Sequence, residues 1–125
     1  MKVRFFNSEE VIDLKDVLKR VQGDKELLAE LFDIYQEDFV IKRQALGVAI
    51  AACDIAKIKG IAHSMKGASG HISAKPLHAA CLKLEALAQE GRSDGMQEIA
   101  SAMDGYFEEV KIFAVRFKKD LGCRS

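Results

Sequence analysis

The sequence has few of the residues that interrupt helices or build folds rich in turns. Among its 125 residues there are one proline, no tryptophan and only 7% aromatic side chains. A single proline argues against a β architecture with many turns, and no strand-like alternation, internal repeat or low-complexity tract is present. At this length about two-thirds of the unfolded surface can be buried around one core. We therefore expect a single all-α domain over residues 1–125.

The sequence also lacks net charge and any clustering of cysteines. Lys plus Arg and Asp plus Glu number 19 each, so overall charge gives no reason to expect a nucleic acid or membrane partner. Cys53, Cys81 and Cys123 lie far apart with no C-x-x-C pair, which disfavours a disulfide framework or a zinc ribbon. No run approaches about 18 apolar residues, and residues 1–14 lack the long apolar run of a signal peptide. We expect a cytoplasmic protein.

Apolar residues recur at intervals of three or four along most of the chain, which is typical of amphipathic helices. Asp13, Asp24 and Asp54 are placed to cap three of them, and Ser73 is expected to cap a fourth. The predicted helices cover residues 14–21, 25–53, 55–72, 74–88 and 96–117. Because the connections are short, consecutive long helices should be antiparallel. The sequence predicts an up-down-up-down four-helix bundle, with the short first helix over one end.

The third predicted helix carries an unusual row of residues one position beyond its core stripe. Apart from two adjacent pairs, Lys59–Gly60 and Lys66–Gly67, its members follow one another at intervals of three residues, and the row should border solvent: Ala56, Lys59, Gly60, His63, Lys66, Gly67 and Gly70. The row lies in a band, residues 55–84, with five lysines and no acidic residue. Such a band suits an anionic group or an acidic docking surface.

The glycines in this row have a cost in helix stability. Each forgoes about 0.8–1.0 kcal/mol relative to alanine inside a helix. One interpretation is that Gly67 merely ends the helix, but Met65, Ser69 and Ile72 keep helical spacing beyond it. The other is that the glycines let a partner surface approach His63 closely. A neutral imidazole is a competent nucleophile near pH 7, and Lys66 can compensate phosphate charge.

Residues 62–87, "AHSMKGASGHISAKPLHAACLKLEAL", contain the pattern A-H-x-M-K-G-A-S followed by an apolar helix ending in L-E. This segment resembles the histidine-containing phosphotransfer (HPt) domains of multistep phosphorelays. Residues 12–39 are similar to the opening helices of that family. One position departs from it, because the family usually has glycine where Ser73 stands. We expect this change to modify the junction between the two helices and to leave the chemistry intact.

The resemblance implies that His63 accepts a phosphoryl group from a receiver-domain phospho-aspartate and passes it to another receiver aspartate. Lys66 would hold the phosphate, and Lys59, Gly60, Gly67 and Gly70 would face the docked partner. The implied partners are response-regulator receivers and a hybrid sensor kinase, and the chain would act as a monomer. No nucleotide-binding motif is present, so we expect neither intrinsic kinase activity nor a cofactor.

Other residues admit more than one interpretation. His71 and His78 could join His63 in a metal site, but we expect ordinary surface histidines, because the break at Ser73 disrupts the geometry. Glu85 could orient the imidazole or pair with a lysine. Apolar candidates for partner docking are Leu31, Phe32, Ile34 and Ile61.

Two other functions fit the same sequence. The chain could be the phosphoacceptor domain of a chemotaxis-type kinase, which a separate ATP-binding domain phosphorylates directly. It could also be a helical adaptor in which His63 has no chemical role.

Overall fold

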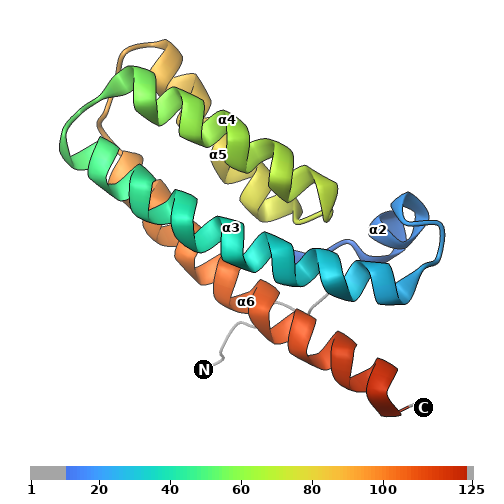
Figure 1. Cartoon of the computed structure of the whole chain (residues 1–125). Helices are drawn as coiled ribbons and strands as arrows, with labels where there is room; N and C mark the ends of the chain where they lie inside the picture. The colour runs from blue at the N-terminus through green and yellow to red at the C-terminus, as the bar shows by residue number, and fades with distance from the viewer. Residues whose placement is uncertain (1–10, 124–125) are drawn as a thin grey trace, which may run out of the picture.

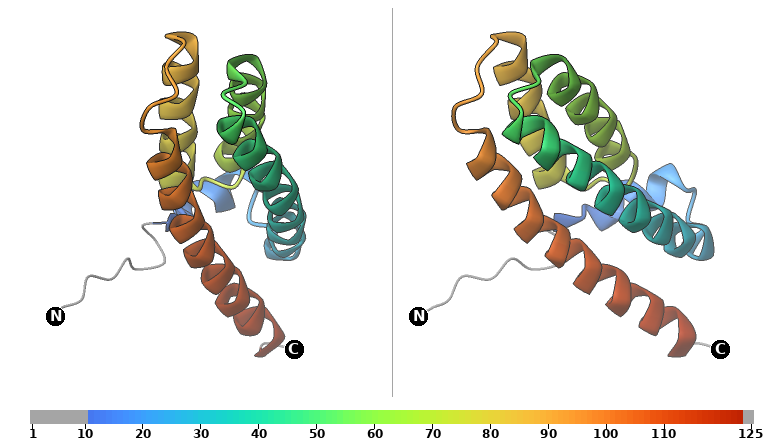
Figure 2. Two further views of the ribbon diagram at one scale, coloured as in Figure 1. Left: turned by 90° about the vertical axis from the view of Figure 1, so that its left-hand side faces the viewer. Right: turned by 60° about the vertical axis from the view of Figure 1, so that its left-hand side comes forward.

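The computed structural model describes residues 11–123, which form an antiparallel bundle of four long helices with a short helix at one end (Figures 1 and 2). The helices are α2 (Leu14–Arg20), α3 (Lys25–Ala51), α4 (Ile55–His71), α5 (Lys75–Gln89) and α6 (Met96–Cys123). The predicted architecture is confirmed. None of the helices between residues 11 and 123 has the length and apolar character needed to cross a membrane.

Three helices begin where the sequence predicts, each at an aspartate. The side chains of Asp13, Asp24 and Asp54 each accept a hydrogen bond from the backbone N–H three residues later, at 3.0, 3.0 and 3.2 Å. These bonds satisfy backbone donors that have no acceptor within the first helical turn. The chain therefore enters each helix through a local signal that needs no tertiary contact.

The apolar stripes of α3 to α6 meet in one core, with two departures from the predicted pattern. Phe32, a candidate for partner docking, is fully buried and contacts Phe113 and Phe117 edge to face at centroid distances of 5.7 and 5.6 Å. Cys53, placed on the core stripe by the sequence, is exposed with a φ of 52°. It lies past the end of α3, so helical spacing no longer governs its direction.

One polar contact crosses the core between α3 and α4. The hydroxyls of Tyr35 and Ser69 are 2.9 Å apart, and both side chains are buried. Burial raises the pKa of Tyr35, so its hydroxyl stays protonated. Because either hydroxyl left unpaired would incur a desolvation cost, the contact favours one alignment of α3 against α4.

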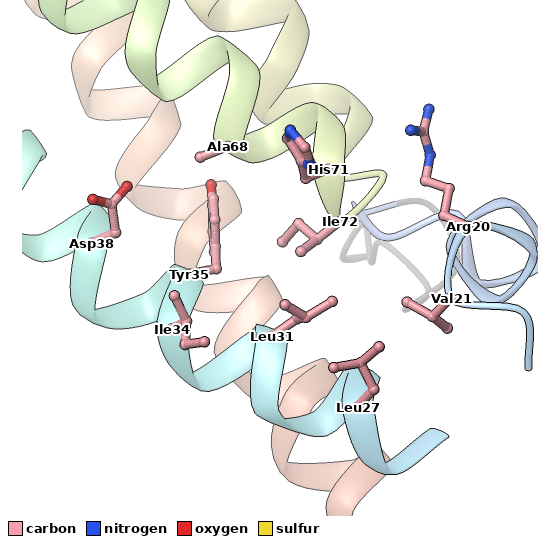
Figure 3. A pocket seen from close by; sticks show the side chains of 10 residues that line it. All are labelled: Arg20, Val21, Leu27, Leu31, Ile34, Tyr35, Asp38, Ala68, His71 and Ile72. Atoms are coloured by element: carbon pink, nitrogen blue, oxygen red, sulfur yellow. The ribbon is translucent and has the colours of Figure 1, made fainter. Parts of the chain in front are cut away.

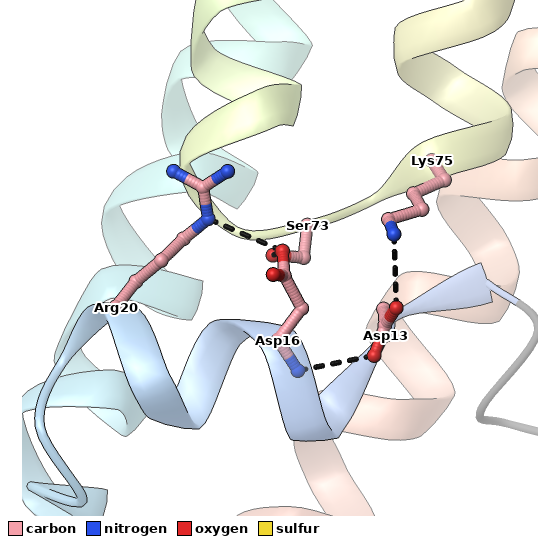
Figure 4. Close-up of polar contacts among 5 residues, drawn as sticks. All are labelled: Asp13, Asp16, Arg20, Ser73 and Lys75. Atoms are coloured by element: carbon pink, nitrogen blue, oxygen red, sulfur yellow. Dashed lines mark hydrogen bonds and ion pairs between the residues drawn. The ribbon is translucent and has the colours of Figure 1, made fainter.

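The turn between α4 and α5 is attached to α2 by both backbone and side chains (Figure 4). The Ser73 hydroxyl donates to Asp16 at 2.6 Å, Lys75 pairs with Asp13 at 2.9 Å, and the Asp13 N–H donates to the Ser73 carbonyl at 3.0 Å. The hydrogen bond from Ser73, followed by that from Arg20, lowers the pKa of Asp16. Lys75 is the largest cause of the lowered pKa of Asp13. Both carboxylates are therefore ionised at neutral pH.

The prediction that Ser73 caps α5 is wrong. The residue at that position is Ala74, which has no capping side chain, and the Ser73 hydroxyl is occupied by Asp16. Ser73 has a φ of 56°, a left-handed conformation that glycine adopts without steric cost. The left-handed turn therefore explains why glycine suits this position. Serine in its place provides a side-chain hydrogen bond to Asp16, which glycine would lack.

We expect a Ser73→Gly variant to be more stable than Ser73→Ala by about 1 kcal/mol, because only alanine keeps the left-handed strain after the hydroxyl is lost. Denaturant unfolding measures the difference. Equal stability of the two variants at neutral pH would contradict the strain argument.

The hydrogen bond from Ser73 to Asp16 also predicts a pH dependence. The folded pKa of Asp16 lies below its unfolded value near 3.8, so the stabilisation that Asp16 contributes is present above that pH and is lost as the pH falls through the folded pKa. The stability advantage of wild type over Ser73→Ala should accordingly shrink below pH 3.8.

Candidate functional site

The row of residues singled out in the sequence lies along the outer side of α4. Helix α4 continues through Gly67 and ends at His71, so the interpretation that Gly67 terminates the helix is wrong. Its opposite side packs into the core through Ile58, Ala62, Met65 and Ser69. The side chain of His63 is 70% exposed, whereas that of Lys66 is 25% exposed.

His63 and Lys66 are joined by a carboxylate from the neighbouring helix. Glu85 on α5 places Oε2 at 2.8 Å from Nδ1 of His63 and Oε1 at 2.7 Å from Nζ of Lys66. Its side chain is only 18% exposed. The sequence left two roles open for Glu85, orienting the imidazole or pairing with a lysine. The structure has both, one on each oxygen.

The charge of Glu85 determines which nitrogen of His63 is available. Hydrogen bonds from Lys66, and secondarily from His63, lower the pKa of Glu85, so the carboxylate is ionised at neutral pH. An ionised carboxylate only accepts hydrogen bonds, so Nδ1 must donate. In the neutral ring the lone pair is then on Nε2. The arrangement thus holds a nucleophilic nitrogen at the surface.

Sequence reasoning named Glu85 only as an open alternative and did not assign it to the site. The register of the antiparallel α4–α5 pair would have placed it there. Residues equidistant from a turn lie side by side in such a hairpin, and the turn here is centred at Ala74, with His63 eleven residues before it and Glu85 eleven residues after it. The same counting pairs Gly70 with His78, whose ring would lie 3.4 Å from a Cβ added at Gly70. Placing the turn at Ala74 is what identifies Glu85.

The fold leaves room for a side chain at each glycine of the row. Leaving aside its own helix backbone and chain neighbours, a Cβ added at Gly60 or Gly67 would meet no heavy atom of residues 11–123 within 4 Å, and one at Gly70 would make an ordinary contact with His78. Packing within the chain therefore does not require glycine at these three positions. Any requirement for glycine at these positions must therefore come from contact with another molecule.

The remaining candidates lie in varied surroundings. Lys59 and Ile34 are exposed, and Leu31 and Ile61 are partly buried against the core. His71 is exposed and His78 is half-buried. In the part of the chain that the structure describes, no group of three His, Cys, Asp or Glu side chains is arranged to hold a metal ion.

Comparison with known proteins gives concordant results. The family model described as "Hpt domain" matches residues 26–112. Histidine-containing phosphotransfer protein B from Pseudomonas aeruginosa PAO1 is similar in structure, with a TM-score of 0.74 and 24% identity over 88% of this chain and 93% of that one. The HPT domain of a sensor hybrid histidine kinase from Shewanella gives a TM-score of 0.70 and 13% identity over 90% and 95%. No curated protein matches significantly.

Proposed function

This chain belongs to the family of Hpt phosphotransfer domains, and we propose that it accepts a phosphoryl group on Nε2 of His63 from a receiver phospho-aspartate and passes it to a second receiver aspartate. The observation that carries this proposal is the 2.8 Å contact of Glu85 with Nδ1, which leaves Nε2 as the free nucleophile. Hpt domains act with receiver domains in phosphorelays, so the partners would be response-regulator receivers and a hybrid sensor kinase.

The proposed transfer balances without any added reagent. The Nε2 lone pair attacks the phosphorus, an N–P bond forms, and the P–O bond to the aspartate breaks, so the carboxylate leaves with the bonding electrons. The ring keeps its proton on Nδ1 and becomes positively charged. Because Glu85 already accepts from Nδ1, it stabilises that charge as it develops. Return to the second aspartate is the same step in reverse.

Lys66 is proposed to neutralise the incoming phosphoryl group. It lies one turn from His63 on the same helix, and its Nζ is held by Oε1 of Glu85. A lysine ammonium is a compact charge on a flexible stem, so a short movement would let it contact phosphate oxygens. The lysine would then hold Glu85 before transfer and the phosphoryl group after it.

The test uses a purified receiver domain charged with acetyl phosphate, in which only the phosphate carries a label. We expect transfer of an acid-labile, base-stable label to this chain, and peptide mapping should place it on the segment that contains His63. Each of the other two histidines serves as an internal control. Absence of label with every receiver tested, or a label mapped to His71 or His78, would refute the proposal.

Labelling by ATP and a separate kinase domain, with no receiver present, tests the chemotaxis-type alternative. That result together with no transfer from receivers would favour the alternative. A chain that takes no label from either donor, yet still binds its partners, would be the helical adaptor.

We expect Gly67→Ala to raise stability and slow transfer. The change should add about 1 kcal/mol to the free energy of unfolding, because alanine is the better helix former and the new methyl meets no other helix or side chain in the described part of the chain. Transfer from the receiver should slow several-fold, since the methyl keeps the partner away from His63. The matched control is Gly105→Ala on α6, where the added Cβ is equally free. Unaltered transfer by Gly67→Ala would show that partner access does not require this glycine.

A further inference from the structure

The outermost line of α4 is a strip of glycine, with His63 on one side of it and Ser64 on the other. Successive residues of a helix point about 100° apart, and this spacing places Gly60 and Gly67 between the directions of His63 and Ser64. Both glycines are exposed, so a partner can approach the backbone along this line. We call Gly60 and Gly67 the α4 strip.

The contact with Glu85 sets the direction in which His63 faces the strip. Glu85 lies on α5 and meets Nδ1 at 2.8 Å, so this nitrogen points towards α5. The two ring nitrogens point in widely different directions, so the lone pair on Nε2 points away from Glu85. The side chain is 70% exposed, which leaves that direction open. An acyl phosphate in line with Nε2 would therefore lie over the α4 strip.

A lysine of α3 lies on the other side of the α4 strip. The Nζ of Lys42 contacts the hydroxyl of Ser64 and pairs with Asp38 at 3.0 Å. Asp38 is on the side of α3 that faces α4, where it lines a pocket together with Ala68 (Figure 3). The Lys42 side chain is 29% exposed, so its ammonium group is positioned at the surface and stays accessible. An ammonium group has three N–H donors, and within residues 11–123 these contacts use two of them.

Two lysines therefore approach the strip from different sides. Lys66 is held on the α5 side by Glu85 at 2.7 Å. Lys42 is held on the α3 side by Ser64, the residue that follows His63. The charge of a phosphoryl group in transfer is spread over three equatorial oxygens, and a lysine on one side reaches only the oxygens nearest to it. A second cation across the strip would compensate the charge on the remaining side.

We propose that Lys42 is a second phosphate-binding residue of the acceptor site and donates to an oxygen of the phosphoryl group as it passes between the receiver aspartate and Nε2 of His63. The inference rests on the proposed function. No bond to Lys42 forms or breaks, and its ammonium group keeps all three protons. Because the phosphoryl group arrives and departs along the same line, Lys42 acts in both transfers.

The test compares maximal rates of label transfer at saturating charged receiver. We expect Lys42→Met to lower the maximal rate about tenfold, which is less than the loss of a fully enclosed donor because Lys42 is partly exposed. Lys42→Arg keeps a cation at this position and should retain most of the rate. Transfer from the phosphorylated Lys42→Met chain to a second receiver should slow as well.

The matched control is Lys25→Met, which removes the same charge from an exposed lysine of α3. It lies about 25 Å from Lys42 along the helix, so its maximal rate should equal that of wild type. A Lys42→Met chain that transfers as fast as Lys25→Met would overturn the proposal. A higher receiver concentration at half-maximal transfer with an unchanged maximal rate would overturn it too, because that result assigns Lys42 to docking alone.

Ser64→Ala separates contact with phosphate from a structural role. This variant removes the contact between α3 and α4 and leaves the ammonium group of Lys42 in place. We expect it to keep most of the wild-type maximal rate. If Ser64→Ala slowed transfer as much as Lys42→Met, the lysine would only align the two helices and the proposal would be wrong. Circular dichroism checks that both variants are folded.

The two proposals fail in different ways. Absence of label in the wild-type chain would be a failure of the proposed function. Normal labelling of wild type, together with an unchanged maximal rate in Lys42→Met, would be a failure of the Lys42 proposal alone.

Discussion

Phosphoryl transfer from a charged receiver to a His63→Gln variant is expected to fall to background, a loss of roughly a thousandfold or more. Glutamine is close to histidine in size, and its amide N–H can still donate to Glu85. It has no nitrogen lone pair able to attack phosphorus. The variant therefore removes the nucleophile while keeping the nearby hydrogen bond, and the measurement is the initial rate of label transfer.

His71→Gln is the matched control, since that residue is also an exposed histidine of α4 and its replacement should leave the rate unchanged. Circular dichroism and denaturant unfolding would establish that both variants are folded. A His63→Gln protein that takes up label as fast as wild type would exclude His63 as the acceptor.

Phe32→Ala is expected to lower the free energy of unfolding by about 3–5 kcal/mol. Phe32 is fully buried and contacts Phe113 and Phe117 in edge-to-face geometry, so its truncation leaves a cavity that rigid helices fill poorly. This loss is a large share of the stability of an ordinary domain. The midpoint of urea unfolding should shift with little change in slope.

Val40→Ala, on the same helix but 56% exposed, should change stability by less than about 0.5 kcal/mol. The contrast distinguishes cavity formation from loss of a surface contact. If Phe32→Ala were as stable as wild type yet bound receivers poorly, the docking role that the sequence suggested for Phe32 would be restored.

Most of the fold could be predicted because its signals are local. The aspartate caps at Asp13, Asp24 and Asp54 act within one turn, and the apolar spacing gives each helix its buried side. Phe32 illustrates the limit of this reasoning. Leu31 and Phe32 point about 100° apart around the helix, and each is three or four residues from both Leu28 and Tyr35, so spacing alone fits either of them. Phe32 is the one enclosed, by Phe113 and Phe117 of α6.

The site was predicted in part for the same reason. His63, Lys66 and the glycines lie on one helix, so spacing alone places them together. Glu85 comes from α5, and its approach depends on where the intervening turn is centred. Ser73 was misassigned because a serine before a helix usually caps it, whereas here a left-handed backbone directs the hydroxyl towards Asp16.

The attachment of α2 to the α4–α5 turn bears on the contact between His63 and Glu85, although roughly 16 Å of chain at helical rise separates Ala74 from His63. One residue added to or removed from the turn would rotate Glu85 by about 100° and move it about 1.5 Å along its helix relative to α4. Its carboxylate would then leave Nδ1. By holding Ser73 and Lys75 in place, contacts from the short N-terminal helix help to keep the register in which the Glu85 carboxylate meets Nδ1 of His63.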